Sequence, residues 1–262
     1  MKIRAKRSLG QNFLVDKNII KKIVDCSVIN NQEILEVGPG TGNLTEEIIK
    51  KNPKKIYLVE KDNTLIEILK EKLSYNIEFI NKDILKVEEK KLSENKLIVF
   101  GNLPYNVSTE ILINWITNIK KDFWFEKLIL MFQKEVANRI ISAHNSSNYG
   151  RLSIISQWKL NIEKMFDIEP NSFRPRPKIE STLLVFTPKK DYENICSEKS
   201  LESISRIFFN QRRKKIKKSF NKIFNNSKEI SDKLNIDLDL RPQNLDYKTY
   251  LLIARELDNL GS

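Results

Sequence analysis

The feature that most constrains the fold is a regular alternation of short apolar runs with stretches of helical spacing over the first two thirds of the chain. Short apolar runs bounded by polar turns are typical of strands that are buried on both faces. Strands that alternate with helices favour βαβ units and a parallel sheet covered by helices on both faces. We therefore predict an α/β fold. The expected strands are residues 34–37, 56–59, 77–80, 97–100 and 128–132, and the expected helices are residues 44–51, 63–73, 107–119 and 134–142.

The pattern changes after residue 188. Two later apolar runs, residues 162–168 and 182–186, are expected to form a final antiparallel pair. Beyond them, apolar residues recur at spacings of three and four, which is typical of amphipathic helices. We therefore predict an α/β domain of residues 1–188 and a small all-α domain of residues 189–262. The expected helices of the second domain lie at about 201–208, 216–224, 227–234 and 246–257.

Composition limits the partners and the chemistry. The net charge of +12 favours an acidic polymer or an anionic membrane, although a lysine-rich genome composition would give the same charge. No apolar run approaches the about 20 residues that a membrane-spanning helix needs, and no apolar stretch follows the basic N-terminus as in an export signal. Cys26, Cys196 and the single His144 argue against a zinc site or a catalytic triad. We expect a cytoplasmic protein without a metal.

A glycine-rich loop, Gly-Pro-Gly-Thr-Gly at residues 38–42, follows the first expected strand and opens a helix. A dinucleotide fingerprint would place its third glycine at position 43, which is Asn43. Pro39 also removes a backbone N–H that a phosphate would use. The spacing therefore favours a ligand with an uncharged ribose and a methionine tail, contacting Gly38 and Gly40. An ordinary strand-to-helix turn would use the same glycines.

Acidic residues follow the next two expected strands. Glu60 lies 22 residues after Gly38, where a Rossmann-like fold needs an acid for the two ribose hydroxyls. Asp83 follows the third strand and can accept a hydrogen bond from an adenine amine, with Ile84 against the ring. Taken singly, Glu60 could be a surface acid and Asp83 could cap a turn. Three features at the carboxyl ends of successive strands instead predict a binding site for S-adenosylmethionine.

The fourth expected strand ends in Asn102, Leu103, Pro104 and Tyr105. A helix-start turn would explain the residues after this tetrapeptide but not the tetrapeptide itself. The amine of adenine is a poor nucleophile because its lone pair is delocalised into the ring. The side-chain carbonyl of Asn102 and the backbone carbonyl of Leu103 can accept its N–H groups and stabilise positive charge in the transition state. Pro104 stiffens the loop, and Tyr105 can stack on the base. The tetrapeptide therefore predicts methyl transfer to an adenine amine.

With these residues the chain resembles the ribosomal RNA adenine dimethyltransferases, and among them the bacterial small-subunit N6-dimethyltransferases (the KsgA family). The resemblance spans essentially the whole chain, and its motifs together are highly specific. They are Leu-Gly-Gln-Asn-Phe-Leu at 9–14, the glycine loop, residues 102–105, Tyr-Gly-Arg-Leu-Ser at 149–153, Phe-Arg-Pro-Arg-Pro-Lys at 173–178 with Ser181, and Gln-Arg-Arg-Lys at 211–214.

The resemblance implies a Rossmann-like methyltransferase domain and a helical C-terminal domain. It implies dimethylation of two adjacent adenosines near the 3′ end of small-subunit (16S) ribosomal RNA, which is part of small-subunit biogenesis. It also implies that Asn12 and Leu14 contact the cofactor, whereas spacing alone suggests that Asn12 is a turn or cap residue. Finally, it implies that Phe173 stacks on the target base, although an aromatic before a proline-rich turn can equally plug a core.

RNA affinity should come mostly from phosphate contacts. The densest basic segments are residues 2–7 and 212–218, and six of the seven residues in the second are basic. A solvated helix face would look the same, but we favour RNA contact through Arg212, Arg213 and Lys214. Arg139 and Arg151 are further candidates, although either can instead pair with a helix carboxylate. The resemblance implies that the partner is the RNA of an immature small (30S) subunit, and we expect a monomer.

Two other functions remain open at this point. The chain could methylate large-subunit (23S) RNA, like the methyltransferases of antibiotic resistance, which share the glycine loop and the Phe-x-Pro-x-Pro-Lys segment. The forms of residues 102–105, 149–153 and 211–214 favour the small subunit instead. The chain could also be a mainly non-catalytic ribosome-assembly factor, but such a role gives no chemical reason for the whole cofactor site and residues 102–105 to be kept together.

Overall fold

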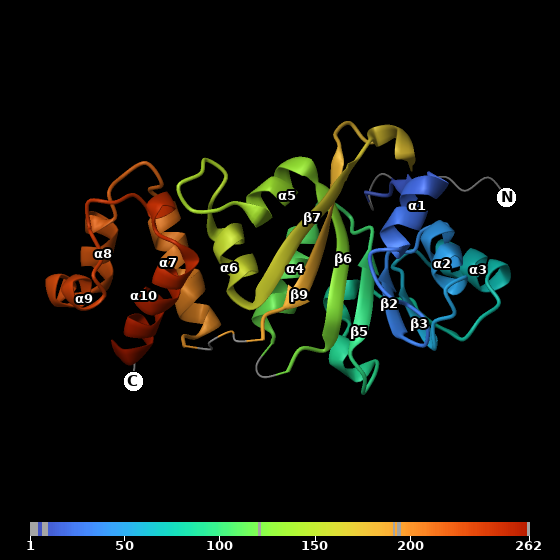
Figure 1. The fold of residues 1–262 in the computed structure, drawn as a ribbon, viewed down its shortest axis with the longest axis horizontal. Coiled ribbons are helices and arrows are strands. Elements are labelled where there is room, and N and C mark those ends of the chain that lie inside the picture. The colour runs from blue at the N-terminus through green and yellow to red at the C-terminus, as the bar shows by residue number, and fades with distance from the viewer. Residues whose placement is uncertain (1–4, 7–9, 120–121, 191, 193–194, 261–262) are drawn as a thin grey trace. The chain divides into compact units, whose positions relative to one another are not determined.

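The computed structural model describes residues 5–6, 10–119, 122–190, 192 and 195–260, and its larger sheet has seven strands (Figure 1). The first five strands of this sheet in chain order pair with one another in parallel, as predicted. Across the sheet the order is β4 (Ile77–Ile80), β3 (Lys55–Val59), β2 (Glu33–Val37), β5 (Leu97–Gly101), β6 (Phe125–Gln133), β9 (Ser181–Pro188) and β7 (Leu160–Ile168).

The centre of the sheet is covered on both faces. Every residue of β2 and β5 is buried, including the two glutamates of β2. Leu35 of β2 lies opposite Tyr57 of β3 on one side and opposite Val99 of β5 on the other. Burial on both faces explains why these strands appear in the sequence as continuous apolar runs. The predicted Rossmann-like α/β class is confirmed.

Among the residues that the structure describes, five α-helices accompany these strands. Four begin and end within two residues of their predicted bounds, and α1 was not predicted. Asp16 caps α1 by accepting hydrogen bonds from the backbone N–H groups of Asn18 and Ile19. Ile20, with its neighbours on the same helix face, packs into the core beside β2 and β3. The helices are α1 (Lys17–Val24), α2 (Asn43–Ile49), α3 (Asn63–Lys72), α4 (Ser108–Thr117) and α5 (Lys134–Ile141).

The expected final strands, residues 162–168 and 182–186, are neighbours at one edge of the sheet, as β7 and β9. The strand β9 also pairs antiparallel with β6, so that Ser181 lies opposite Gln133. A second, two-stranded sheet joins β1 (Phe13–Leu14) to β8 (Phe173–Arg174). Strands of two residues are too short to show a periodic pattern in the sequence. Their pairing connects the N-terminal segment to the chain between β7 and β9.

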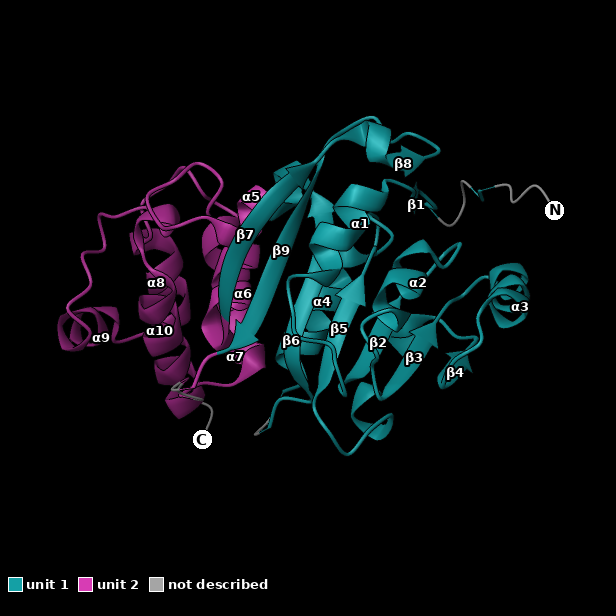
Figure 2. Cartoon of the chain, turned by 45° about the vertical axis from the view of Figure 1, so that its right-hand side comes forward, with its two compact units in different colours: residues 1–137, 161–188 teal, residues 138–160, 189–262 magenta. Residues whose placement is uncertain are grey.

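The chain divides into two compact units, which Figure 2 colours separately. Unit 1 comprises residues 1–137 and 161–188, and unit 2 comprises residues 138–160 and 189–262. The domain boundary expected after residue 188 is therefore also a boundary between the two units. Residues 138–160, however, belong to the same unit as residues 189–262. That residues 189–262 fold as a domain stays a prediction.

Unit 2 has an aromatic core. Phe208, Phe220 and Tyr250 are fully buried in it, and Trp158 and Tyr149 reach it from residues 138–160. The helix that carries Trp158, α6 (Arg151–Lys159), was not predicted, because its apolar residues lie on several faces and leave no amphipathic pattern. The other helices of unit 2 are α7 (Glu198–Phe209), α8 (Lys217–Ile223), α9 (Ser227–Lys233) and α10 (Tyr247–Leu260). The 3₁₀ turns among the described residues of both units are η2 (Ile84–Lys86), η3 (Glu89–Lys91), η4 (Pro170–Ser172) and η5 (Pro242–Asn244).

Over the part of the chain that the structure describes, no helix is both long and apolar enough to cross a membrane.

Candidate active site

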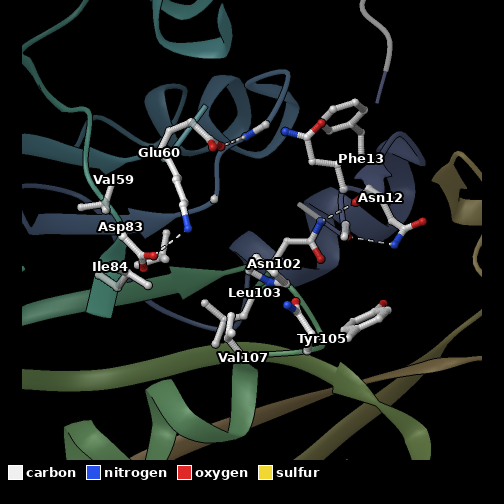
Figure 3. Close-up of a pocket in the computed structure, with 18 of the residues that line it drawn as sticks. Asn12, Phe13, Val59, Glu60, Asp83, Ile84, Asn102, Leu103, Tyr105 and Val107 are labelled. Atoms are coloured by element: carbon white, nitrogen blue, oxygen red, sulfur yellow. Dashed lines mark hydrogen bonds and ion pairs between the residues drawn. The ribbon is translucent and has the colours of Figure 1, made fainter. Parts of the chain in front are cut away.

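The carboxyl ends of β2, β3 and β5 enclose a cavity in unit 1 (Figure 3). Gly38 follows β2, Glu60 follows β3 and Asn102 follows β5, while Asp83 comes shortly after β4. Open parallel sheets bind ligands outside these strand ends. The four features that the sequence singled out thus lie together. The cavity is lined by Gly10, Gln11, Asn12, Phe13, Val37, Gly38, Gly40, Val59, Glu60, Lys61, Lys82, Asp83, Ile84, Asn102, Leu103, Pro104, Tyr105, Asn106 and Val107.

The glycine loop leaves no room for side chains. Gly38 and Gly40 have φ angles of 69° and 57°, in the left-handed region that favours glycine. A Cβ atom on Gly38 would lie 3.2 Å from the backbone oxygen of Asn102, and one on Gly40 would lie 2.7 Å from Cδ1 of Phe13. The bare backbone therefore forms a wall of the cavity, against which a ligand can lie.

Glu60 is the buried acid of the cavity, with 8% of its surface exposed. Its Oε1 accepts the backbone N–H of Asp62 at 2.8 Å, and its Oε2 accepts that of Gly40 at 3.4 Å. Burial raises the pKa of this carboxyl, while those two N–H groups act in the opposite direction. A carboxylate oxygen has a second lone pair, so both oxygens can still accept hydroxyls. This geometry fits a ribose diol.

Asp83 caps a turn, which is the alternative that the sequence left open, and its contact with the cofactor stays a prediction. Its Oδ1 caps the turn η2 by accepting the N–H of Leu85 at 3.1 Å, and its Oδ2 accepts Nζ of Lys61 at 2.8 Å. The hydrogen bond from Lys61 lowers the pKa of Asp83, so the group is an ionised acceptor at neutral pH. Ile84 lies beside it in the cavity wall. Together they can hold the amine and the face of an adenine.

Asn102 has a defined amide orientation. Its Nδ2 donates to the backbone oxygen of Asn12 at 2.8 Å, which leaves Oδ1 as the atom available to accept a hydrogen bond (Figure 3). Leu103 follows Asn102 and is closely packed. A Cβ atom added to Gly101 would lie 2.9 Å from Cδ2 of Leu103. The hydroxyl of Tyr105 lies 2.5 Å from Oγ of Ser181. Asn102, Leu103 and Tyr105 therefore line one cavity.

The N-terminal segment completes the cavity. Asn12 and Phe13 line it, whereas Leu14 lies behind the glycine loop, beside a smaller cavity that also contacts Glu36. The backbone oxygen of Leu14 accepts Nδ2 of Asn43 at 2.8 Å, which ties β1 to the start of α2. Sequence reasoning missed Phe13 as a lining residue. The only available signal was its place between Asn12 and Leu14, which the resemblance implicates.

Phe173 does not line the cavity. Its ring is fully buried in the core of unit 1, together with Leu14, Ile168 and Leu183. The structure therefore gives it the core position that the sequence left as an alternative. Stacking on a target base stays a prediction, and it requires the ring to leave this core.

The basic residues predicted to bind RNA belong to unit 2, whereas the cavity is lined by residues of unit 1. Arg213 and Lys214 are exposed and line a groove with other basic side chains of residues 209–222. Arg212 is partly buried, and its guanidinium donates to the backbone oxygens of Ser146 and Ser147 and to Oε1 of Gln243. Arg212 thus has structural partners that the other two lack among the described contacts.

The other basic candidates are less informative. Of the N-terminal segment 2–7, only residues 5 and 6 are described, and Lys6 pairs with Asp62 at 2.7 Å. The rest of that segment lies outside the described residues. Arg151 pairs with Glu202 of α7 at 3.4 Å, which is the helix-carboxylate alternative. In the described ranges, no three His, Cys, Asp or Glu side chains lie close enough together to hold a metal ion.

The cavity lies at the carboxyl ends of a Rossmann-like sheet and has a wall of glycine backbone. Glu60 is placed for ribose hydroxyls, and the Asn102 amide lies beside the ring of Tyr105. This arrangement defines the class of S-adenosylmethionine-dependent methyltransferases. Comparison with known proteins agrees. The family model of the ribosomal RNA adenine dimethylases matches residues 2–259, and the chain belongs to this family. It is therefore a ribosomal RNA adenine dimethyltransferase that uses S-adenosylmethionine.

Individual relatives support the assignment. The chain is 58% identical over 260 residues to a ribosomal RNA small subunit methyltransferase A from Pelagibacter ubique, with 99% of each chain covered. A dimethyladenosine transferase from Plasmodium falciparum has a similar structure, with a TM-score of 0.76, 25% identity, and 95% and 98% of the two chains covered. The 23S rRNA methyltransferase ErmE has a TM-score of 0.70 at 23% identity, with 94% and 100% covered, and this likeness concerns the fold alone.

Proposed function

We propose that this enzyme dimethylates the N6 atoms of two adjacent adenosines near the 3′ end of 16S ribosomal RNA, within an immature 30S subunit. The full-length likeness to a small-subunit methyltransferase supports this choice of subunit. The enzyme acts in the cytoplasm as a monomer and contributes to small-subunit biogenesis.

The observation that carries the proposal is the orientation of Asn102. Because its Nδ2 is engaged by Asn12, its Oδ1 faces the cavity as an acceptor. An adenine amine placed there can donate one N–H to Oδ1 and the other to the backbone oxygen of Leu103. Both bonds strengthen as the nitrogen becomes pyramidal and positive, so they stabilise the transition state more than the ground state.

The remaining residues bind and orient. S-adenosylmethionine supplies an activated methyl group, so the chain needs no acid or nucleophile of its own. Glu60 accepts the ribose hydroxyls, Asp83 and Ile84 hold the adenine of the cofactor, and Gly38, Gly40, Asn12 and Leu14 shape the rest of its site. Pro104 stiffens the acceptor loop, and Tyr105 stacks on a target base that has left its helix.

RNA is held by phosphate contacts outside the cavity. We assign these to Arg213 and Lys214, whose side chains are exposed in the basic groove of unit 2. Arg212 belongs to the same set, although part of its hydrogen-bonding capacity is used by Ser146 and Ser147. Phe173 would add a second aromatic surface for the base if its segment rearranges on binding.

The test is methyl incorporation into immature small subunits by the wild type, by Asn102→Ala and by Asn118→Ala, followed by mapping of dimethyladenosine. Asn118 is exposed at the end of α4 and serves as the matched control. We expect incorporation at two adjacent adenosines near the 3′ end, a loss of about 10²-fold or more with Asn102→Ala, and no change with Asn118→Ala. Incorporation only into large-subunit RNA would favour the 23S alternative, and none into any RNA would favour an assembly factor.

A further inference from the structure

The phenol of Tyr105 is fastened to a strand from a distant part of the chain. Its hydroxyl and Oγ of Ser181 lie 2.5 Å apart, and 76 positions separate the two residues. In Figure 3 the oxygen of Tyr105 is at the end of the ring farthest from Asn102. Burial raises the pKa of the Tyr105 hydroxyl, so the group stays protonated at neutral pH. The contact is therefore a neutral hydrogen bond.

Ser181 itself has little freedom. It is fully buried, it begins β9, and it lies opposite Gln133 at the end of β6. The residue before it is also fixed, because the backbone N–H of Lys134 donates to the oxygen of Glu180 at 3.0 Å and Nζ of Lys134 pairs with the Glu180 carboxylate at 2.5 Å. The sheet thus holds the serine hydroxyl at a defined point.

The other end of Tyr105 is fixed by the loop between β5 and α4. Oγ of Ser108 donates to the backbone oxygen of Tyr105 at 3.2 Å, and the N–H of Val107 donates to the oxygen of Pro104 at 3.0 Å. With its backbone tied to α4 and its hydroxyl tied to β9, the side chain has one preferred orientation. Its ring then presents a fixed surface to the cavity that Asn102 and Leu103 also line.

We propose that Ser181 is a positioning residue for methyl transfer: its hydroxyl holds the ring of Tyr105 in the orientation that seats the target adenine beside Asn102. Holding an aromatic ring before the substrate arrives removes an ordering cost from the binding and reaction steps. Ser181 does not line the cavity, and it acts through Tyr105 alone. The inference rests on the base-seating role proposed for Tyr105.

Three variants and one control separate this role from a general effect on the fold. Ser181→Ala removes one partner of the hydrogen bond, Tyr105→Phe removes the other and keeps the ring, and the double variant removes both. Thr182→Val is the matched control. It removes the hydroxyl of the adjacent, fully buried residue of β9, which donates to Asp167 at 2.7 Å and does not line the cavity.

The first readout concerns the ring and does not require activity. The chain has seven tyrosines. With tyrosine labelled by ¹³C at the ε positions, the resonances that disappear in Tyr105→Phe identify Tyr105. In measurements of ¹³C relaxation, we expect one ordered orientation of the Tyr105 side chain in the wild type and in Thr182→Val, and averaging over several orientations in Ser181→Ala. A Tyr105 side chain that is equally ordered in Ser181→Ala overturns the proposal. This readout does not depend on whether the wild type methylates small-subunit RNA.

The second readout is steady-state methyl transfer to immature small subunits. We expect kcat to fall about tenfold in Ser181→Ala and in Tyr105→Phe, to fall no further in the double variant, and to stay near the wild-type value in Thr182→Val. The KM for S-adenosylmethionine should stay within about twofold in all of them. Additive losses in the double variant, a Tyr105→Phe variant with the kcat of the wild type, or an equal loss in Thr182→Val would each overturn the proposal.

Discussion

At the residue scale, the chemistry depends on which atom of the Asn102 amide faces the cavity. The donor Nδ2 is occupied by the backbone oxygen of Asn12, a residue 90 positions away in the chain. One hydrogen bond therefore does two things, since it attaches the N-terminal segment to the acceptor loop and it orients Oδ1 toward the substrate. A substitution at Asn102 can fail for either reason, and the choice of side chain separates them.

Asn102→Asp tests the orientation. A carboxylate has the same shape as the amide but cannot donate, so it would place an oxygen against the backbone oxygen of Asn12. We expect the N-terminal segment to detach and the affinity for S-adenosylmethionine to fall, in addition to the loss of methyl transfer. Asn102→Ala should lose methyl transfer with a smaller loss of affinity. Titration calorimetry with S-adenosylmethionine measures the difference, and equal affinities for the two variants would contradict the assigned amide orientation.

Glu36 makes stability depend on pH. It is 1% exposed, its Oε2 has no hydrogen-bond partner among the described residues, and burial raises its pKa to about 8. The unfolded chain releases this proton near pH 4.5, whereas the folded chain keeps it. Stability from this group is thus fully present below about pH 4.5 and is lost as the pH rises toward 8, by about 1.4 kcal/mol per pH unit.

Glu36→Gln should remove this dependence, because an amide does not ionise. We expect the free energy of unfolding of the wild type to fall relative to that of the variant between pH 5 and pH 8. Denaturant melts at several pH values, without cofactor, measure the difference. A wild type that gains stability over the variant in this range would contradict the burial of an acid with a raised pKa.

At the element scale, the site is made where short segments meet, and the glycine loop is packed against β1. Gly40 has a φ of 57°, and a Cβ there would lie 2.7 Å from the ring of Phe13. Gly40→Ala should therefore displace Phe13, weaken the binding of S-adenosylmethionine and lower stability by about 1 kcal/mol or more. Calorimetry and thermal melting check both effects.

Gly150→Ala is the matched control for this change. Gly150 has an extended φ of −171°, and the nearest atom to an added Cβ is 3.9 Å away on Phe209. We expect cofactor affinity to be unchanged in this variant. If Gly40→Ala bound the cofactor as tightly as Gly150→Ala, the glycine loop would not form the wall described above.

The elements also differ in how far the sequence predicts them. The parallel strands were predicted because burial on both faces leaves apolar runs, and the carboxyl-end rule then placed Glu60, Asp83 and Asn102 together. The helix α6 is not predicted from the sequence because it is buried on several faces. The helix α1 is not predicted either, although Asp16 is a typical capping residue at its start. Pairing of β1 with β8 and the bond between Tyr105 and Ser181 depend on tertiary packing, which no local pattern encodes.

At the scale of the whole molecule, charge and chemistry are separated in the chain. The lining of the cavity comes from unit 1, whereas the groove formed by residues 209–222 belongs to unit 2 and carries seven arginine and lysine side chains. A net charge of +12 attracts any polyanion, so total charge alone does not identify the surface that binds RNA. Arg213 and Lys214 are the sharper candidates because they are exposed within that groove.

The dependence of RNA affinity on salt tests this surface. Each side chain that neutralises a phosphate contributes about 0.7 to 0.9 to the slope of log K against log salt. Replacing Arg213 and Lys214 by alanine should make that slope less steep by about 1.5. Replacing Lys70 and Lys91 by alanine removes the same charge from exposed positions of unit 1 and should leave the slope unchanged. Filter binding of small-subunit RNA over a range of salt measures both slopes. Equal changes in the two double variants would mean that net charge, and not the groove, determines the binding of RNA.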